Sequence, residues 1–367
     1  MKIQFDHQIF ASQKYGGVSR YFYELMKGFD IIKGVETDIS LLLSNNHYIS
    51  EKKYTNHINF LSEKELRGKH RLFNLFNKPN SVHILKKQNF EIFHPTYYET
   101  YFLKYIGTKP FVLTVYDMIH EKFPDMFGIN DKTSKNKKLL TERATKIIAI
   151  SESTKKDLVE IFGTDESKIE VVYLGNSMFP ELKTGAKLKI PNKYVLFVGS
   201  RCRYKNFEKF IKSMSPILNK DKNLCVICAG GGKFNFKELE IFSSLNIVTQ
   251  ITQYNFDDTT LANFYQNAQL FVFPSLYEGF GIPILESFAC QCPLLCSNKS
   301  SLPEVAGNGA YYFDPYSEES MRNTIIKVLE DQHLQDELRQ KGTERLEQFS
   351  WKKTAIETKR IYESAIK

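Results

Sequence analysis

The sequence has no hydrophobic run long enough to cross a bilayer. A membrane-spanning helix needs about 20 consecutive apolar residues. No stretch of this chain approaches that length, and 25% of its 367 residues are charged. The first residues alternate between apolar and polar side chains and reach Asp6 early, which is typical of a β-strand and not of a secretory or transit peptide. We therefore expect a cytoplasmic protein.

Cysteine is scarce, and its distribution argues against a disulfide framework. All six cysteines lie in the C-terminal half, at positions 202, 225, 228, 290, 292 and 296, so reduced thiols are expected. Cys225 and Cys228 form a CxxC pair within an apolar run that is predicted to be a strand. Side chains three residues apart on a strand point to opposite faces, so the pair does not predict a zinc site.

Signatures of nucleic-acid and dinucleotide binding are also absent. The sequence has no zinc-finger spacing, no aromatic RNP motif and no helix-turn-helix pair. A glycine triplet at 230–232 follows a predicted strand but lacks the GxGxxG spacing of an NAD site. The formal net charge of +8 suits nucleic acid, anionic lipid or a phosphorylated substrate, so charge alone does not choose between them.

The length and the alternation of elements predict two α/β domains. A single core rarely grows beyond about 250–300 residues, and strands alternate with helices in both halves, which predicts parallel, doubly wound sheets. We expect an N-terminal domain over 1–175, a linker over 176–191, a C-terminal domain over 192–349 and a final helix over 350–367. The strands are predicted at 35–43, 91–94, 111–115, 147–150, 169–172, 194–198, 224–229, 247–251 and 270–273.

The most informative stretch is 274–286, which reads Pro-Ser-Leu-Tyr-Glu-Gly-Phe-Gly-Ile-Pro-Ile-Leu-Glu. A buried strand is predicted before it, and Pro283 opens a helix after a loop that contains Gly281. Such a helix start offers unpaired N–H groups and a positive dipole end, which suit a diphosphate. Glu278 and Glu286 flank it and could accept hydrogen bonds from a sugar and a ribose. The stretch therefore predicts a sugar-nucleotide site.

Other polar loops follow predicted strands. The loop at 199–206 carries Arg201, Arg203 and Lys205, which suit a diphosphate leaving group. Because ligands bind beyond the carboxyl ends of parallel strands, this loop should lie at the ligand edge of its sheet.

Loops of the N-terminal half show the same arrangement. Gly16 and Gly17 open a helix and allow a ligand close to the backbone, although a glycine pair is also ordinary turn chemistry. His94, Asp117 and His120 lie at or just after the ends of strands, and we expect them at one crevice. Asp117 and His120 could polarise or deprotonate an acceptor hydroxyl.

Two basic segments have more than one interpretation. Residues 62–88 are basic and amphipathic, and they could lie at an anionic membrane interface or form an ordinary surface helix. Lys132, Lys135, Lys137 and Lys138 are predicted to form a solvated helix face.

Over nearly its whole length the chain resembles the GT-B retaining glycosyltransferases of family 4. The most specific part is the paired-glutamate run at 278–286, followed by Pro293 and by Ser-Leu-Pro-Glu-Val at 301–305. The resemblance implies an α/β fold of the GT-B type, with two Rossmann-like domains that face each other across a cleft. It also implies that the final helix crosses back to the N-terminal domain.

The resemblance assigns roles to residues of the C-terminal half by position. Glu278 would contact the donor sugar and Glu286 the nucleotide ribose. Backbone N–H groups from Phe280 through Gly281 to Ile282 would contact the diphosphate.

The family's phosphate-binding residues match this chain only in part. Lys205 matches the lysine, whereas Ser200 occupies the arginine position, so Arg201 or Arg203 would take over that role.

In the N-terminal half the resemblance covers the acceptor side. Gly16 and Gly17 match the family's glycine loop. Tyr116 stands where the family often has a histidine, so His94 or His120 would supply any imidazole.

The implied activity is a metal-independent, cofactor-free and retaining transfer of a sugar. The donor would be a GDP- or UDP-linked sugar, and the acceptor a hydroxyl of a glycan or a lipid-linked glycan, in lipopolysaccharide or capsule assembly at the inner face of a membrane. The lack of an Asp-x-Asp motif is consistent with this activity. Two alternatives remain: a sugar-nucleotide epimerase or hydrolase of the same fold, and a non-catalytic nucleotide-binding scaffold, which Tyr116 and Ser200 motivate.

Overall fold

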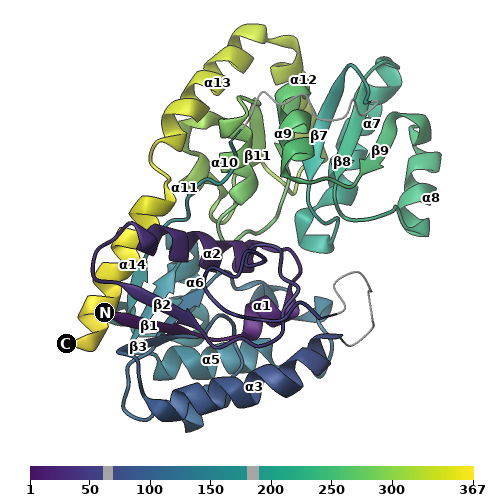
Figure 1. Cartoon of the computed structure of the whole chain (residues 1–367). Helices are drawn as coiled ribbons and strands as arrows, with labels where there is room; N and C mark the ends of the chain where they lie inside the picture. Colours follow the sequence, from purple (N-terminus) through teal and green to yellow (C-terminus); the bar gives the residue numbers. More distant parts are fainter. Residues whose placement is uncertain (61–68, 180–189) are drawn as a thin grey trace. The chain divides into compact units, whose positions relative to one another are not determined.

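The computed structural model describes residues 1–60, 69–179 and 190–367, in two compact units (Figure 1). Unit 1 contains Met1–Gly175 and Trp351–Lys367, and unit 2 contains Asn176–Ser350. Most of the expected linker, residues 180–189, and the first part of the basic segment, residues 62–68, lie outside the described residues. No helix in the described part of the chain is long and apolar enough to cross a membrane.

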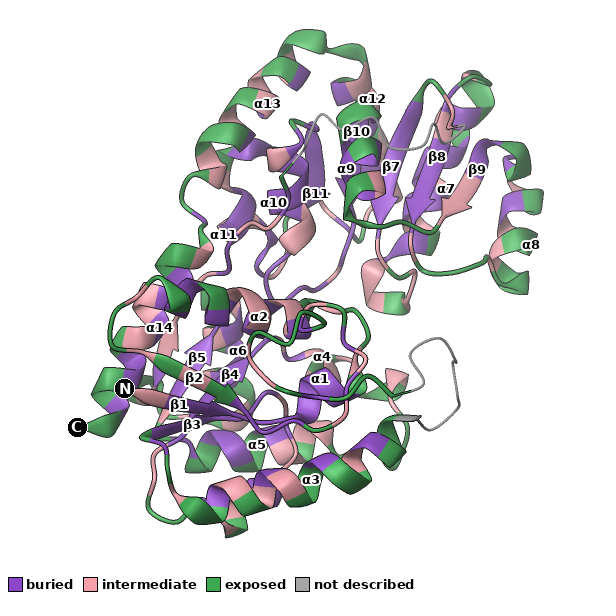
Figure 2. Ribbon diagram, viewed as in Figure 1, coloured by how far each residue is buried: buried purple, intermediate pink, exposed green. Residues whose placement is uncertain are grey.

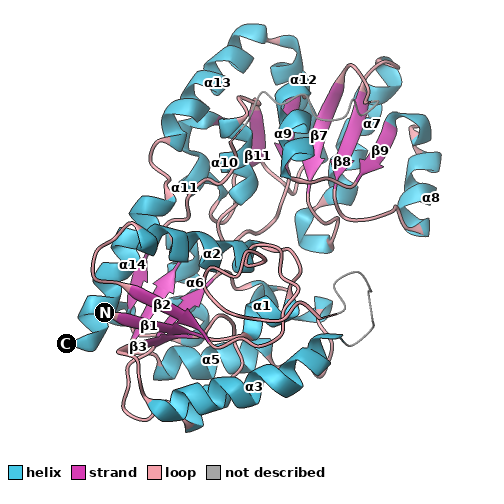
Figure 3. Ribbon diagram, in the orientation of Figure 1, coloured by secondary structure: helices cyan, strands magenta, loops and turns pink. Residues whose placement is uncertain are grey.

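All paired strands of unit 1 are parallel, as predicted (Figure 3). They form two sheets with the orders β2-β1-β3 and β4-β5-β6, and a bridge between Phe93 and Phe111 joins the sheets. Because β1 lies between β2 and β3, the strand order reverses at β1, and ligands bind at such reversals. The strands are β1 Lys2–Phe5, β2 Glu36–Ile39, β3 Ile92–His94, β4 Val112–Val115, β5 Lys146–Ala149 and β6 Ile169–Val171.

The last helix of the chain belongs to unit 1 and packs against α2. Gly28 permits this close packing, since a Cβ atom there would lie 2.5 Å from the Cβ of Ala355. The N-terminal cap of α6 is Ser151, which accepts a hydrogen bond from the Thr154 amide. The helices are α1 Gln8–Ser12, α2 Gly17–Asp30, α3 Lys69–Lys87, α4 Ile119–Lys122, α5 Thr133–Arg143, α6 Glu152–Phe162 and α14 Trp351–Ile366.

Unit 2 has one parallel sheet with the order β12-β11-β10-β7-β8-β9. Counted along this unit, the order is that of the dinucleotide-binding fold, and it reverses between β7 and β10. The loops after these two strands are therefore neighbours at the ligand edge. The strands are β7 Tyr194–Val198, β8 Cys225–Ala229, β9 Ile251–Tyr254, β10 Leu270–Phe273, β11 Leu294–Ser297 and β12 Ala310–Phe313.

Aromatic and aliphatic side chains form the core between this sheet and its helices, and Figure 2 shows β7, β8 and β10 almost entirely buried, whereas β9 is mostly intermediate. Phe197 of β7 stacks on Phe210 of α7, with the ring centroids 5.8 Å apart. The helices are α7 Phe207–Lys220, α8 Phe236–Ser244, α9 Asp258–Asn267, α10 Ile282–Ala289, α11 Leu302–Ala306, α12 Glu318–Glu330 and α13 Gln332–Leu346. The six cysteines are free thiols, as expected.

Three sequence predictions are wrong or incomplete. The strand predicted at 247–251 is a 3-10 turn, Val248–Gln250, and the strand begins only at Ile251. Strands β11 and β12 were not predicted. Lys137 is fully buried, so the expected solvated lysine face does not include it.

Candidate functional site

In unit 2 the strand reversal brings Lys205 and Glu278 together. The Lys205 ammonium donates a hydrogen bond to Glu278 Oε1 at 2.6 Å, and the side chains are 15% and 12% exposed. The two loops are also joined through their backbones, because the Leu276 amide donates to the carbonyl of Tyr204 at 2.7 Å. Two residues that the sequence proposed separately thus form one charged pair at the ligand edge of the sheet.

Two serines from the start of α11 hold the glutamate loop in place. Ser300 Oγ lies 2.9 Å from the amide and 3.1 Å from the carbonyl of Glu278. Ser301 Oγ lies 2.9 Å from the carbonyls of both Glu278 and Phe280. The sequence pattern did not single out these contacts, although Ser301 opens the motif at 301–305.

Gly281 makes the turn from this loop into α10. Its φ is +101°, in the left-handed region that favours glycine. A Cβ atom there would also lie 2.9 Å from Leu302 Cδ2, so the Leu302 side chain would have to shift. The N-terminus of α10 therefore begins at Ile282, directly after the glutamate loop.

Glu286 lies within α10 and is 8% exposed. Its Oε2 accepts a hydrogen bond of 3.1 Å from the hydroxyl of Tyr265, on α9. Burial raises the pKa of Tyr265 well above its usual value, so this hydroxyl stays a donor. Tyr265 orients Glu286, and no local sequence signal pointed to it.

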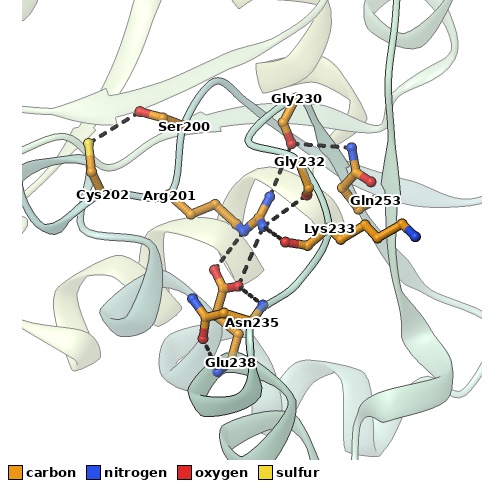
Figure 4. A network of polar contacts seen from close by, with 9 residues as sticks. All are labelled: Ser200, Arg201, Cys202, Gly230, Gly232, Lys233, Asn235, Glu238 and Gln253. Carbon is orange, nitrogen blue, oxygen red and sulfur yellow. Dashed lines mark hydrogen bonds and ion pairs between the residues drawn. The ribbon is translucent and has the colours of Figure 1, made fainter. Parts of the chain in front are cut away.

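The Arg201 side chain is buried and hydrogen-bonded inside unit 2 (Figure 4). Its Nε donates to Glu238 Oε1 at 2.6 Å, and its Nη1 and Nη2 donate to the carbonyls of Gly230, Gly232 and Lys233 at 3.0 Å each. The side chain is only 5% exposed. Arg201 therefore clamps the glycine loop after β8 to the first turn of α8, and this arrangement does not favour it as a phosphate ligand.

Ser200 and Arg203 of the same loop are exposed. Arg203 is exposed and lines a cavity of about 600 Å³ with residues of α7 and α8. Ser200, at the position where the resemblance has an arginine, contacts Cys202 through a 3.2 Å hydrogen bond to its sulfur. Of the two candidate arginines, Arg203 is the one that solvent reaches.

In unit 1, Gly16 and Gly17 lie at the N-terminus of α2, as predicted. Gln13 Oε1 lies 3.4 Å from the Ser19 amide in the first helical turn and accepts its hydrogen bond. A Cβ atom at Gly16 would lie 2.2 Å from this same Oε1 atom. The glycine therefore allows Gln13 to cover the start of the helix, and Gly17 has open space around it.

His94 lies in the core of unit 1. Its Nδ1 is 2.5 Å from the hydroxyl of Tyr362 on α14, and its Nε2 is 2.9 Å from Thr114 Oγ1 on β4. Burial lowers the pKa of His94 to about 3, so the ring stays neutral. With both nitrogens bonded inside the protein, His94 is placed to fasten α14 to the sheet.

The stability of unit 1 should therefore depend on the protonation of His94. The unfolded chain binds a proton at His94 below about pH 6.5, and the folded chain does not until about pH 3. Its contribution is complete above pH 6.5 and falls as the pH drops. Between pH 7 and pH 5 we expect wild type to lose about 2 kcal/mol more free energy of unfolding than His94→Gln.

Urea titrations followed by Trp351 fluorescence measure this difference, because the only tryptophan lies in unit 1. The exposed His47, changed to glutamine, is the matched control and should keep the wild-type slope. Identical pH slopes for wild type and His94→Gln would contradict the assignment.

The loop after β4 carries the remaining candidates. The ring of Tyr116 packs against Tyr21 with centroids 5.6 Å apart, and its buried hydroxyl has no partner among the described groups. Asp117 is half-buried, and its Oδ1 accepts from the Ile119 amide at 2.9 Å. His120 stacks on Phe127, with centroids 3.8 Å apart, and burial lowers its pKa. Asp117 and His120 are both half-buried, whereas Tyr116 is buried.

Two family models match the chain, one in each unit. Residues 15–176 match Glycosyltransferase Family 4, and residues 180–345 match Glycosyl transferases group 1. An uncharacterized glycosyltransferase of Methanocaldococcus jannaschii is 24% identical, over 96% of this chain and 95% of its own length. O-antigen chain mannosyltransferase B of Escherichia coli is 38% identical, but over only 29% of this chain and 28% of its own length.

Solved structures agree on the architecture. The crystal structure of Anabaena HepE in complex with UDP and glucose covers 99% of this chain and 100% of its own, with a TM-score of 0.74 and 16% identity. At this identity the similarity establishes the fold.

Proposed function

The chain belongs to the glycosyl transferases of group 1 and has the GT-B fold, and we propose that it transfers a sugar from a nucleotide diphosphate sugar to a hydroxyl of a glycan or lipid-linked acceptor. The observation that carries this proposal is the Lys205–Glu278 pair at the strand reversal of unit 2. A cation and a hydrogen-bond acceptor there match a diphosphate and the sugar beside it.

Each part of the donor has a proposed partner. The Lys205 ammonium and the N-terminus of α10 face the diphosphate, with Arg203 as the second cation. The Glu278 carboxylate accepts a hydrogen bond from a sugar hydroxyl. Glu286, held by Tyr265, accepts one from the ribose. No metal or other cofactor is required in this proposal, because Lys205 supplies the positive charge.

The proposed reaction retains the configuration of the sugar. The bond between C1 and the diphosphate oxygen breaks, the acceptor oxygen bonds to C1 on the same face, and the acceptor proton passes to the departing diphosphate. Charge develops on the diphosphate as the bond breaks, and Lys205 stabilises it there. In this route Glu278 is not a nucleophile, which agrees with its pairing to Lys205. Asp117 of unit 1 is proposed to orient the acceptor hydroxyl.

The pathway is proposed from the relatives. One partial relative is named as an O-antigen chain mannosyltransferase, and we propose that this chain likewise acts in surface polysaccharide assembly. GDP- and UDP-linked sugars are both candidate donors. The decisive assay incubates the protein with each in turn, with and without a glycan acceptor, and separates the products. Free sugar without acceptor would indicate a hydrolase, an altered sugar nucleotide an epimerase, and binding without turnover a scaffold.

We also propose that α3 contacts an anionic membrane surface. Leu72, Leu75 and Phe76 are 39%, 68% and 49% exposed on this helix. Arg71 and Lys78 are exposed beside them. Apolar side chains that enter the headgroup region, with cations nearby, are typical of an interfacial helix.

Liposome sedimentation tests this contact. Changing both Leu75 and Phe76 to serine should lower the partition onto vesicles that contain phosphatidylglycerol by about tenfold, because their apolar area no longer leaves water. Ile31→Ser is the matched control, since Ile31 is 66% exposed on another helix end. Equal binding by the double variant, or equal binding to neutral vesicles, would refute the contact.

A further inference from the structure

Lys137 is an ammonium group buried inside unit 1. The residue is fully buried on α5, whereas Lys135 and Lys138 beside it are exposed. Burying an ammonium group costs several kcal/mol unless it is paired and hydrogen-bonded. The contacts of the Lys137 ammonium group must therefore account for its burial.

The Lys137 ammonium contacts the segments that follow β3 and β4. Its Nζ donates to the carbonyl of Asp117 and to Glu121 Oε2, each at 2.9 Å. The ammonium also lies 5.3 Å from the ring centre of Tyr98. The Glu121 side chain is 1% exposed, and its Oε1 has no partner among the described groups. Lys137 is thus the cation that compensates this buried carboxylate.

The same contacts fix the loop at several points. Lys137 holds the carbonyl of Asp117, and the Tyr98 hydroxyl accepts a hydrogen bond of 3.2 Å from the Tyr116 amide. The Asp117 side chain then turns back to accept from the Ile119 amide at 2.9 Å. The backbone before and at Asp117 and the carboxylate itself are therefore all oriented, and the position of that carboxylate depends on Lys137.

We propose that Lys137 is a positioning residue for acceptor binding, which holds Asp117 in the place where it orients the acceptor hydroxyl. This inference rests on the proposed function of Asp117. A misplacement of about 1 Å at a reacting group can cost about 10²-fold in rate. Loss of the Lys137 contacts should therefore change the kinetic constants for the acceptor and not those for the donor.

Loss of Lys137 also leaves the buried Glu121 carboxylate without its cation, and breaking a buried ion pair is strongly destabilising.

The first test compares Lys137→Met with Lys138→Met, an exposed neighbour on the same helix, in the full chain. We expect Lys137→Met to lower kcat/KM for the acceptor by about 10²-fold. The KM for the sugar nucleotide should be unchanged. A variant that only melts at a lower temperature, with wild-type acceptor kinetics, would overturn the proposal.

The double variant Lys137→Met/Glu121→Gln removes both the ammonium group and the carboxylate that it compensates. It therefore tests the positioning role without an unpaired buried charge, and it can be measured if the single variant folds poorly. It should keep a reduced kcat/KM for the acceptor, because the Asp117 carbonyl still lacks its donor. Full activity of the double variant would refute the positioning role. Asp117→Asn in the wild-type background tests the underlying assignment separately: if acceptor kinetics do not change, the proposed function of Asp117 fails first.

Discussion

Replacing Lys205 by methionine is expected to lower kcat/KM for the sugar nucleotide by about 10²–10³-fold. The Lys205 ammonium lies at the strand reversal, 2.6 Å from Glu278 Oε1, and it is the charge that stabilises the departing diphosphate in the proposed reaction. Loss of one such pre-placed donor typically costs this much in rate. Methionine keeps most of the length of the side chain, so the change removes charge more than packing.

The controls for this experiment separate charge from packing. Lys212 is an exposed lysine of α7 that pairs with Glu208 on the surface, and Lys212→Met should keep wild-type kinetics. Glu278→Gln should raise the KM for the donor while it leaves Lys205 charged. Wild-type turnover by Lys205→Met would refute the donor site.

Replacing Arg201 by methionine is expected to lower the free energy of unfolding of unit 2 by about 3–5 kcal/mol, the usual cost of breaking a buried ion pair. The Arg201 and Glu238 side chains are 5% and 12% exposed. The variant leaves the Glu238 carboxylate without its cation and the carbonyls of the glycine loop without their donors (Figure 4). Gly231, in the same loop, has no side chain that could donate hydrogen bonds to these carbonyls in place of Arg201.

The matched control for Arg201 is Arg203, two residues along the same loop and exposed. Arg203→Met should keep the stability of unit 2 and weaken donor binding. Urea unfolding followed by circular dichroism measures both variants, and Trp351 fluorescence checks that unit 1 is unaffected. If Arg201→Met retains wild-type stability but loses donor binding, Arg201 is a phosphate ligand and the structural interpretation is wrong.

The parts of the site that the sequence predicted are those with local signals. Glu278 and Glu286 lie eight residues apart around a glycine turn, and Lys205 lies in the loop between a strand and a helix, so strand, loop and helix start could be recognised from the pattern. The strands at 194–198 and 270–273 were predicted correctly because they are continuous apolar runs with clear ends. Their adjacency in the sheet was not predictable from those runs alone.

The parts that the sequence did not predict depend on contacts between distant segments. Ser300 and Ser301 hold a loop more than 20 residues before them. Tyr265 reaches Glu286 from another helix. Strands β11 and β12 are short, and β12 has two half-exposed residues. Contacts between distant segments and short strands leave no periodic pattern of apolar residues from which they could be predicted.

Several charged and titratable residues that the sequence offered as candidates are buried in the structure. Arg201, His94 and Lys137 each looked available in the sequence, because charged and polar residues are usually exposed. In the structure each is almost completely buried and hydrogen-bonded to groups far along the chain. A single sequence does not reveal such partners, and these residues changed from ligand candidates or surface charges to structural ones.

The most direct test of the account is the rate at which the chain forms an acceptor-linked sugar from GDP- and UDP-linked donors, with Lys205→Met measured beside wild type. We expect acceptor-dependent product with the anomeric configuration of the donor, formed at least about 10²-fold more slowly by the variant. Equal rates for the two proteins, or product of inverted configuration, would contradict the proposed function.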